Sequence, residues 1–155
     1  MNDLPMQSRT NARLAAVQAL YQMEATGIGV ESVIREFIDH RLGTEIDGVL
    51  LGEADAKFFD DVVRGVVNSQ AKIDLAINMR LAKNWKLSRL DATARSILRA
   101  GAYELVNRAD IPGRAIIDEY MEIANAFFES DEPKFINGVL DGVYREVRDD
   151  ETVQG

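Results

Sequence analysis

Cysteine is absent from the 155-residue chain, and histidine occurs only once, as His40. The absence of cysteine excludes disulfides, thiolate nucleophiles and cysteine-ligated zinc or iron–sulfur centres. A single imidazole excludes every metal site or acid–base scheme that needs two. His40 itself has no evident partner in the sequence, and a cation near the end of a predicted helix is expected on structural grounds alone.

Long hydrophobic runs are also absent. No stretch approaches the roughly 18 consecutive apolar residues of a membrane span, and residues 1–5 have neither the charged nor the apolar region of a secretory signal. We therefore expect a cytoplasmic protein without a membrane partner. Only three prolines and eleven glycines occur, and 46% of the residues are hydrophobic, so the composition excludes a disordered or fibrous chain.

The chain has little positive charge, with 18 Lys and Arg against 26 Asp and Glu and a net charge of −8. This balance argues against bulk electrostatic binding of nucleic acid. Residues 74–114 are the exception, because they hold eight basic residues and four acidic ones. This segment either forms an anion-binding face or is neutralised by acidic neighbours in the fold.

Helical periodicity runs through almost every segment, and no sustained alternation of period two indicates a strand. We predict an all-α helical bundle. Its first helix has Ser8 as N-cap, an apolar stripe through Leu14, Val17, Leu20 and Tyr21, and Gly27 just past its end. Phe58 belongs to the apolar stripe of the helix expected over 54–81, and Asp91 is the expected N-cap of the helix over 92–108. A flexible arm is expected at 1–8, a single domain at 9–148 and a frayed tail at 149–155. Helices are expected over about 9–25, 30–42, 54–81 with a break at 68–69, and 92–108, with two more that begin near 112 and 132; 43–53 is expected to be a loop and 85–88 a turn.

Catalytic and metal sites find no support in the sequence. Asp118, Glu119 and Glu122 share a helix face, but a di-metal bundle also needs Glu-x-x-His motifs, which the chain lacks. No glycine-rich phosphate loop follows a predicted strand. We therefore expect neither a cofactor nor an enzymatic activity.

Two arginine pairs offer a recognition signal. Arg9 and Arg13 lie four residues apart on the first predicted helix, and Arg95 and Arg99 repeat the spacing on another. Like charges at this spacing repel each other unless an anion lies between them. The alternatives are solvent-exposed charge and intramolecular ion pairs.

Phe135 is the candidate aromatic partner for such a site. It lies in the first turn of the last predicted helix, beside Lys134 and one residue ahead of the core stripe. Single-stranded RNA is held by stacking of bases on flat side chains combined with phosphate contacts. The alternative is that Phe135 forms the lid of the hydrophobic core.

Three segments resemble one known family. Residues 9–21 (RTNARLAAVQALY) resemble the opening helix of the NusB family of bacterial transcription antitermination factors. Residues 96–105 (SILRAGAYEL) resemble its central helix, and residues 134–141 (KFINGVLD) its C-terminal signature. The match runs from about Arg9 to Arg148 in the family's order and spacing.

This resemblance implies a fold of two roughly perpendicular three-helix groups and a role without catalysis. It implies binding of boxA, a single-stranded element of ribosomal RNA leader transcripts, together with the small-subunit ribosomal protein NusE, in the RNA polymerase antitermination complex. Arg9 and Arg13 match the basic N-terminal motif and Tyr21 its final aromatic, while Asp131, Lys134 and Phe135 match the C-terminal RNA-side cluster.

One departure affects the expected affinity. Thr10 and Asn11 occupy the middle of a motif that is often richer in Arg and Lys. We therefore predict weak RNA binding by the chain alone and stronger binding with the ribosomal partner. The alternative function is a helical protein–protein adaptor without RNA affinity of its own. The predicted RNA-binding residues are Arg9, Arg13, Tyr21, Arg95, Arg99, Asp131, Lys134 and Phe135.

Overall fold

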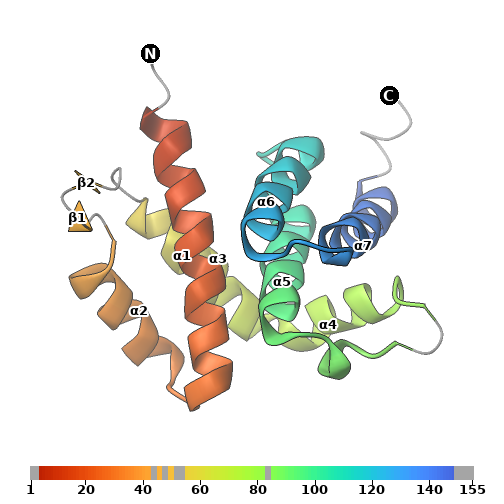
Figure 1. Cartoon of the computed structure of the whole chain (residues 1–155), viewed down its shortest axis with the longest axis horizontal. Coiled ribbons are helices and arrows are strands. Elements are labelled where there is room, and N and C mark those ends of the chain that lie inside the picture. Colours follow the sequence, from red (N-terminus) through yellow and green to blue (C-terminus); the bar gives the residue numbers. More distant parts are fainter. Residues whose placement is uncertain (1–3, 43–44, 47–48, 51–54, 83–84, 149–155) are drawn as a thin grey trace. The chain divides into compact units, whose positions relative to one another are not determined.

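The computed structural model describes residues 4–42, 45–46, 49–50, 55–82 and 85–148, and these form the predicted all-α fold (Figure 1). Residues 1–67 and 68–155 make two compact units. The perpendicular arrangement of two three-helix groups and the single domain over 9–148 stay predictions. The described helices are α1 (Leu4–Thr26), α2 (Val30–His40), α3 (Ala56–Asn68), α4 (Gln70–Asn78), α5 (Ala92–Asn107), α6 (Gly113–Phe127) and α7 (Glu132–Val147), with a 3-10 turn, η1 (Leu87–Arg89).

The first unit differs from expectation at the start of α1, at the end of α2 and in the segment after α2. Helix α1 begins at Leu4, so Ser8 lies inside it and is not its N-cap. The predicted loop at 43–53 contains a short antiparallel pair, β1 (Glu45–Ile46) and β2 (Val49–Leu50), and its other residues lie outside the described chain, as do residues 1–3 of the predicted arm and the whole predicted tail. Gly27 ends α1 as predicted, with a φ of 77° that a residue without Cβ adopts freely.

The buried face of α1 is made largely of alanines. Ala12, Ala16 and Ala19 are completely buried, and Val17 and Leu20 complete the stripe. Leu14 and Tyr21 are exposed, so their prediction as core residues was wrong. Small side chains allow α2 to approach α1 closely, and the core of this unit gains its bulk from Phe37 and Phe59, whose rings stack 5.5 Å apart.

Helix α5 is the central element of the second unit, where it packs against α4, α6 and α7. Asp91 caps it as predicted, accepting hydrogen bonds from the backbone N–H groups of Thr93 (2.8 Å) and Ala94 (3.3 Å). The predicted break at 68–69 is also confirmed, because α3 ends at Asn68 and α4 begins at Gln70.

The carboxyl end of α5 is held by Arg148, which is buried after the end of α7. Its guanidinium donates hydrogen bonds to the carbonyl oxygens of Leu105 (2.9 Å), Ile111 (2.7 Å), Glu104 (3.2 Å) and Arg108 (2.8 Å). The last carbonyls of a helix have no partner within the helix. One buried cation therefore satisfies the end of α5 and the turn that leads to α6.

Gly101 on α5 permits the close approach of its neighbours. A Cβ at this position would lie 3.0 Å from Leu140 Cδ2 and 3.4 Å from Tyr120 Cδ2. Gly101→Val should therefore lower the free energy of unfolding by about 1–3 kcal/mol through overpacking, measured by urea denaturation.

Gly138→Ala is the matched control for this prediction. A Cβ at Gly138 meets no atom within 4 Å, and the residue lies within helix α7, so this variant should gain about 0.4–1 kcal/mol. Equal stability of the two variants would contradict a packing role for Gly101.

Candidate nucleic-acid interface

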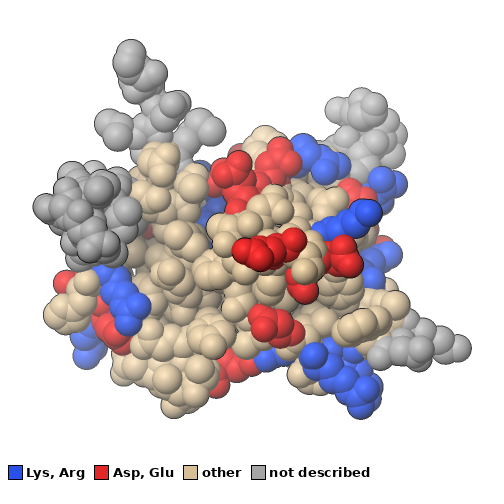
Figure 2. Space-filling model, viewed as in Figure 1, with Lys and Arg blue, Asp and Glu red and all other residues tan. Residues whose placement is uncertain are grey.

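Ion pairs neutralise much of the basic segment 74–114. Within the described residues, Lys86 and Arg89 are exposed and form no ion pair. Figure 2 shows Lys and Arg side chains gathered in the region where Figure 1 draws the turn before α5. The neutralised cations pair as Arg80 with Glu146, Arg99 with Asp74, Arg108 with Asp110 and Arg114 with Asp141.

Arg95 and Arg99, predicted as an RNA-binding pair, make contacts within the protein. Arg99 forms two hydrogen bonds with the carboxylate of Asp74, at 2.9 and 3.0 Å, and so ties α5 to α4. Arg95 Nη1 donates to the carbonyl oxygens of Leu87 (3.1 Å) and Leu90 (2.6 Å). The alternative of an intramolecular ion pair therefore describes Arg99, and Arg95 holds the η1 turn in place.

Phe135 lies at the start of α7 and is partly exposed, so it is neither fully solvated nor a sealed part of the core. Its ring packs against that of Trp85, with the centroids 6.0 Å apart and the planes tilted by 46°. Asp131 and Lys134 are exposed, and the Asp131 carbonyl accepts a hydrogen bond from the Phe135 backbone N–H (3.1 Å). The first turn of α7 thus presents an aromatic ring, a carboxylate and an ammonium group.

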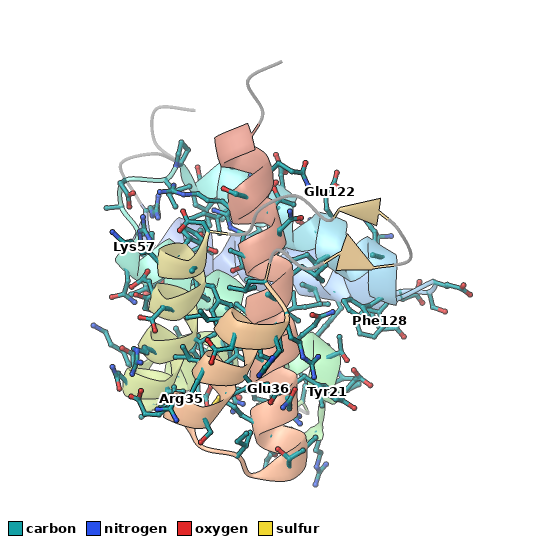
Figure 3. All side chains as sticks on the ribbon, turned by 90° about the vertical axis from the view of Figure 1, so that its left-hand side faces the viewer. Tyr21, Arg35, Glu36, Lys57, Glu122 and Phe128 are labelled. Atoms are coloured by element: carbon teal, nitrogen blue, oxygen red, sulfur yellow. The ribbon has the colours of Figure 1, made fainter. Side chains whose placement is uncertain are left out.

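Tyr21 projects from α1 with 45% of its surface exposed (Figure 3). The adjacent Gln22 donates a hydrogen bond to Glu36 on α2 (2.9 Å), and Arg41 donates another (3.1 Å). These two bonds hold the pKa of Glu36 below its ordinary value, so this carboxylate stays ionised. Tyr21 therefore offers an exposed aromatic side chain on α1, and its neighbour in the chain, Gln22, binds the ionised Glu36 of α2.

Arg9 and Arg13 converge on Phe58 of α3. Each guanidinium carbon lies 4.8 Å from the centroid of this ring. The negative face of an aromatic quadrupole attracts cations, which offsets part of the repulsion between two like charges. Arg13 is only 5% exposed, so Arg9 presents more of this charge to solvent.

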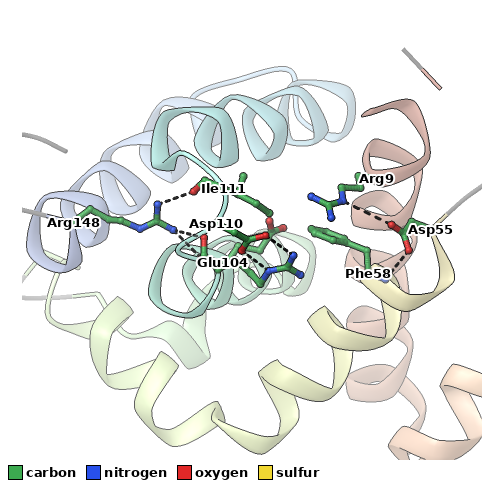
Figure 4. A network of polar contacts seen from close by, with 8 residues as sticks. Arg9, Asp55, Phe58, Glu104, Asp110, Ile111 and Arg148 are labelled. Atoms are coloured by element: carbon green, nitrogen blue, oxygen red, sulfur yellow. Dashed lines mark hydrogen bonds and ion pairs between the residues drawn. The ribbon is translucent and has the colours of Figure 1, made fainter. Parts of the chain in front are cut away.

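Asp55 links the Arg9 side chain to the start of α3. Its Oδ1 accepts a hydrogen bond from the Phe58 backbone N–H (2.9 Å), as an N-cap does, and its Oδ2 lies 3.7 Å from Arg9 Nε (Figure 4). Its own backbone N–H donates to the Ser8 carbonyl of α1 (3.0 Å). The carboxylate therefore both fixes the position of Arg9 and competes with any anion for it.

Sequence reasoning missed three residues of these surfaces. Phe58 was counted only as part of a core stripe, and Asp55 was not singled out at all. Trp85 was counted only as part of the predicted turn. A lone tryptophan in a polar segment nevertheless indicates a binding surface, because exposing such a large ring is costly.

Two further findings concern other kinds of site. Among the described residues, no three His, Asp or Glu side chains gather in a way that would hold a metal ion. In the same part of the chain, none of the helices combines the length and apolar character needed to cross a bilayer.

Comparisons with known proteins agree on one family. A model of the NusB family matches residues 10–145. The transcription antitermination protein NusB of Caulobacter vibrioides is 58% identical over 144 residues, covering 93% of this chain and 97% of that protein. The protein of the same name from Agrobacterium fabrum is 53% identical, covering 93% and 87%.

Solved structures show the same fold. T. maritima NusB aligns with a TM-score of 0.76 at 30% identity, covering 94% of this chain and 96% of that one. A crystal structure of antitermination factors NusB and NusE in complex with dsRNA aligns with a TM-score of 0.75 at 22% identity, covering 91% and 98%. With a family match over most of its length and a closely similar relative, the chain belongs to the NusB family, whose members named here are transcription antitermination proteins.

Proposed function

We propose that this protein is a transcription antitermination factor that binds the single-stranded boxA element of ribosomal RNA leader transcripts together with the ribosomal protein NusE, within the RNA polymerase antitermination complex. The observation that carries the proposal is the partly exposed ring of Phe135 beside Lys134, a cation without an ion pair in the described chain. A flat ring beside an ammonium group matches a base and its phosphate. The NusB–NusE structure with RNA supports this assignment by its fold.

The first turn of α7 is proposed to contact the bases. Phe135 offers a face on which an unpaired base stacks, and the Asp131 carboxylate accepts hydrogen bonds from exocyclic amino groups of bases. Lys134 is proposed to neutralise a phosphate. Arg95 and Arg99 support this surface indirectly, since both are engaged by neighbouring groups of the protein.

The start of α1 is proposed to contact the phosphate backbone. Arg9 is the more accessible cation of its pair. Arg13, which is buried against Phe58, adds to the positive electrostatic potential around Arg9. Tyr21 adds an exposed aromatic face on the same helix. A small number of available cations on a chain of net charge −8 implies modest affinity and a shallow salt dependence.

A protein–protein adaptor is the second candidate, and one observation favours it. Helices α4 and α7 border an open, mostly apolar cavity of about 210 Å³. Leu75 and Met79 expose 62% and 61% of their surface there, next to Val147. Exposed apolar side chains grouped in this way are typical of protein interaction sites. In the proposed function, this surface serves partner binding in addition to RNA binding.

RNA affinity should depend on the ribosomal partner. A titration of boxA RNA at moderate salt should show weak binding by this chain alone and much tighter binding in the presence of NusE, because the partner contributes its own cations. Equal affinities in the two titrations would contradict this prediction.

Phe135→Ala separates the two interpretations of this ring. As a stacking platform, the ring's loss should weaken RNA binding by about 1–3 kcal/mol with little change in stability. As a core lid, it should lower the free energy of unfolding by about 3–5 kcal/mol instead. Fluorescence-anisotropy titration and urea denaturation of the same preparation measure both quantities.

Asp55→Asn should strengthen RNA binding by up to about fivefold, because it removes the charge that competes for Arg9. Asparagine caps helices as well as aspartate does, so stability should barely change. Asp55→Ala is the control, and it should lose about 0.5–2 kcal/mol of stability with the cap. Weaker RNA binding by Asp55→Asn would show that the carboxylate positions Arg9 more than it competes for it.

A further inference from the structure

Trp85 is the only tryptophan of the chain, and 53% of its surface is exposed. It lies in the segment between α4 and η1, outside the core of the second unit. Its ring contact in the described structure is with Phe135. Large aromatic side chains gain much from burial, and the exposed part of this ring is available to a ligand.

Trp85 and the residues that follow it make hydrogen bonds that anchor their backbone. Its own N–H donates to the Ala82 carbonyl (2.8 Å), and the N–H of Leu87 donates to Asn78 Oδ1 at the end of α4 (3.3 Å). The Leu87 side chain is buried, and its carbonyl is held by Arg95 (3.1 Å). A group carried on such an anchored segment loses little conformational freedom when it binds a ligand.

The contact with Phe135 further restricts the tryptophan ring. A centroid separation of 6.0 Å and a tilt of 46° fall within the range of favourable aromatic pairs. Because the planes are tilted, the rings are not stacked face to face. The pair therefore forms a bent aromatic surface that is larger than either ring alone.

Cations close in sequence to the two rings suit a polyanion. Lys86 follows Trp85 in the chain, Arg89 closes the η1 turn, and Lys134 precedes Phe135. All three are exposed and form no ion pair within the described residues, unlike Arg80, Arg99, Arg108 and Arg114. Cations interleaved with aromatic rings are the combination that holds single-stranded nucleic acid.

We propose that Trp85 is a second stacking platform, which holds an unpaired RNA base next to the one on Phe135, while Lys86 and Arg89 neutralise the flanking phosphates. This inference rests on the proposed function and assigns a role to a residue of the segment before η1. It predicts that the second unit binds two bases of a single strand and not one.

The emission of Trp85 tests this directly, because no other tryptophan contributes to it. The full-length protein is titrated with boxA RNA, with and without NusE, and excited where tyrosine does not absorb. Stacking of a base should quench the emission and protect it from acrylamide at the same RNA concentrations that give binding by anisotropy.

Variants at position 85 distinguish base stacking on an aromatic ring from contact with any large apolar side chain. Trp85→Leu should weaken RNA binding by roughly 5- to 150-fold, the range of one lost base stack, without changing the slope of affinity against salt. Trp85→Phe should recover most of the loss. Lys86→Gln should instead reduce that slope by about one. Ile38→Ala, which truncates a comparably exposed apolar side chain on α2, is the matched control and should bind as the unsubstituted protein does.

Three results would overturn the inference. The first is unchanged Trp85 emission at saturating RNA together with unchanged affinity of Trp85→Leu, while Phe135→Ala still loses RNA binding; the proposed function then stands without a role for Trp85. The second is loss of NusE binding by Trp85→Leu at unchanged RNA affinity, which assigns the ring to a protein interface. The third is an unsubstituted protein that binds no boxA RNA even with NusE, which removes the proposed function as well.

Discussion

The burial of α5 constrains the whole second unit. This helix contacts α4, α6 and α7, so its faces must fit three neighbours at once, and Gly101 admits Leu140 and Tyr120 where a Cβ would already lie 3.0 Å from Leu140 Cδ2. The polar groups that α5 brings into the interior must also be satisfied. Tyr120 donates a hydrogen bond to the buried Glu104, and Arg148 covers the final carbonyls. Interiors tolerate such groups only when they are paired. The positions of the η1 turn, which follows Trp85, and of α7, which carries Phe135, depend on this packing.

The arginine side chains described above mainly make contacts within the protein. Arg148 and Arg95 donate to backbone carbonyls, Arg99 joins two helices through Asp74, and Arg9 and Arg13 lie against Phe58. The planar guanidinium suits these roles because it offers several donors in fixed directions. Lysines, by contrast, are exposed wherever the structure describes their side chains. Few cations of the described chain are therefore left to bind a ligand. Their location indicates the binding surface better than the net charge does.

Sequence patterns predicted the features that depend on local chemistry. Asp91 as a cap, Gly27 as a helix end and the break before Gln70 all follow from interactions within a few residues. The patterns failed where tertiary contacts decide. Leu14 and Tyr21 fit the apolar stripe of α1, but alanines occupy its closest contacts and leave the larger side chains outside. The partners of Arg95 and Arg99 could not be predicted either, because carbonyls of η1 and the carboxylate of Asp74 come together only in the fold.

The hydrogen bonds of Arg148 to the end of α5 also affect how the chain folds during its synthesis on the ribosome. Helix α5 is complete by Asn107, but the cation that satisfies its terminal carbonyls is made about forty residues later, after all of α7. Until then, the Leu105 carbonyl, which accepts a hydrogen bond from Arg148 (2.9 Å), is left to water, and α5 lacks one of its neighbours. The contacts described for α1, α2 and α3, in contrast, all join residues before 68. The nascent polypeptide should thus acquire its two halves in sequence, and the later half should remain open to chaperones until translation has passed residue 148.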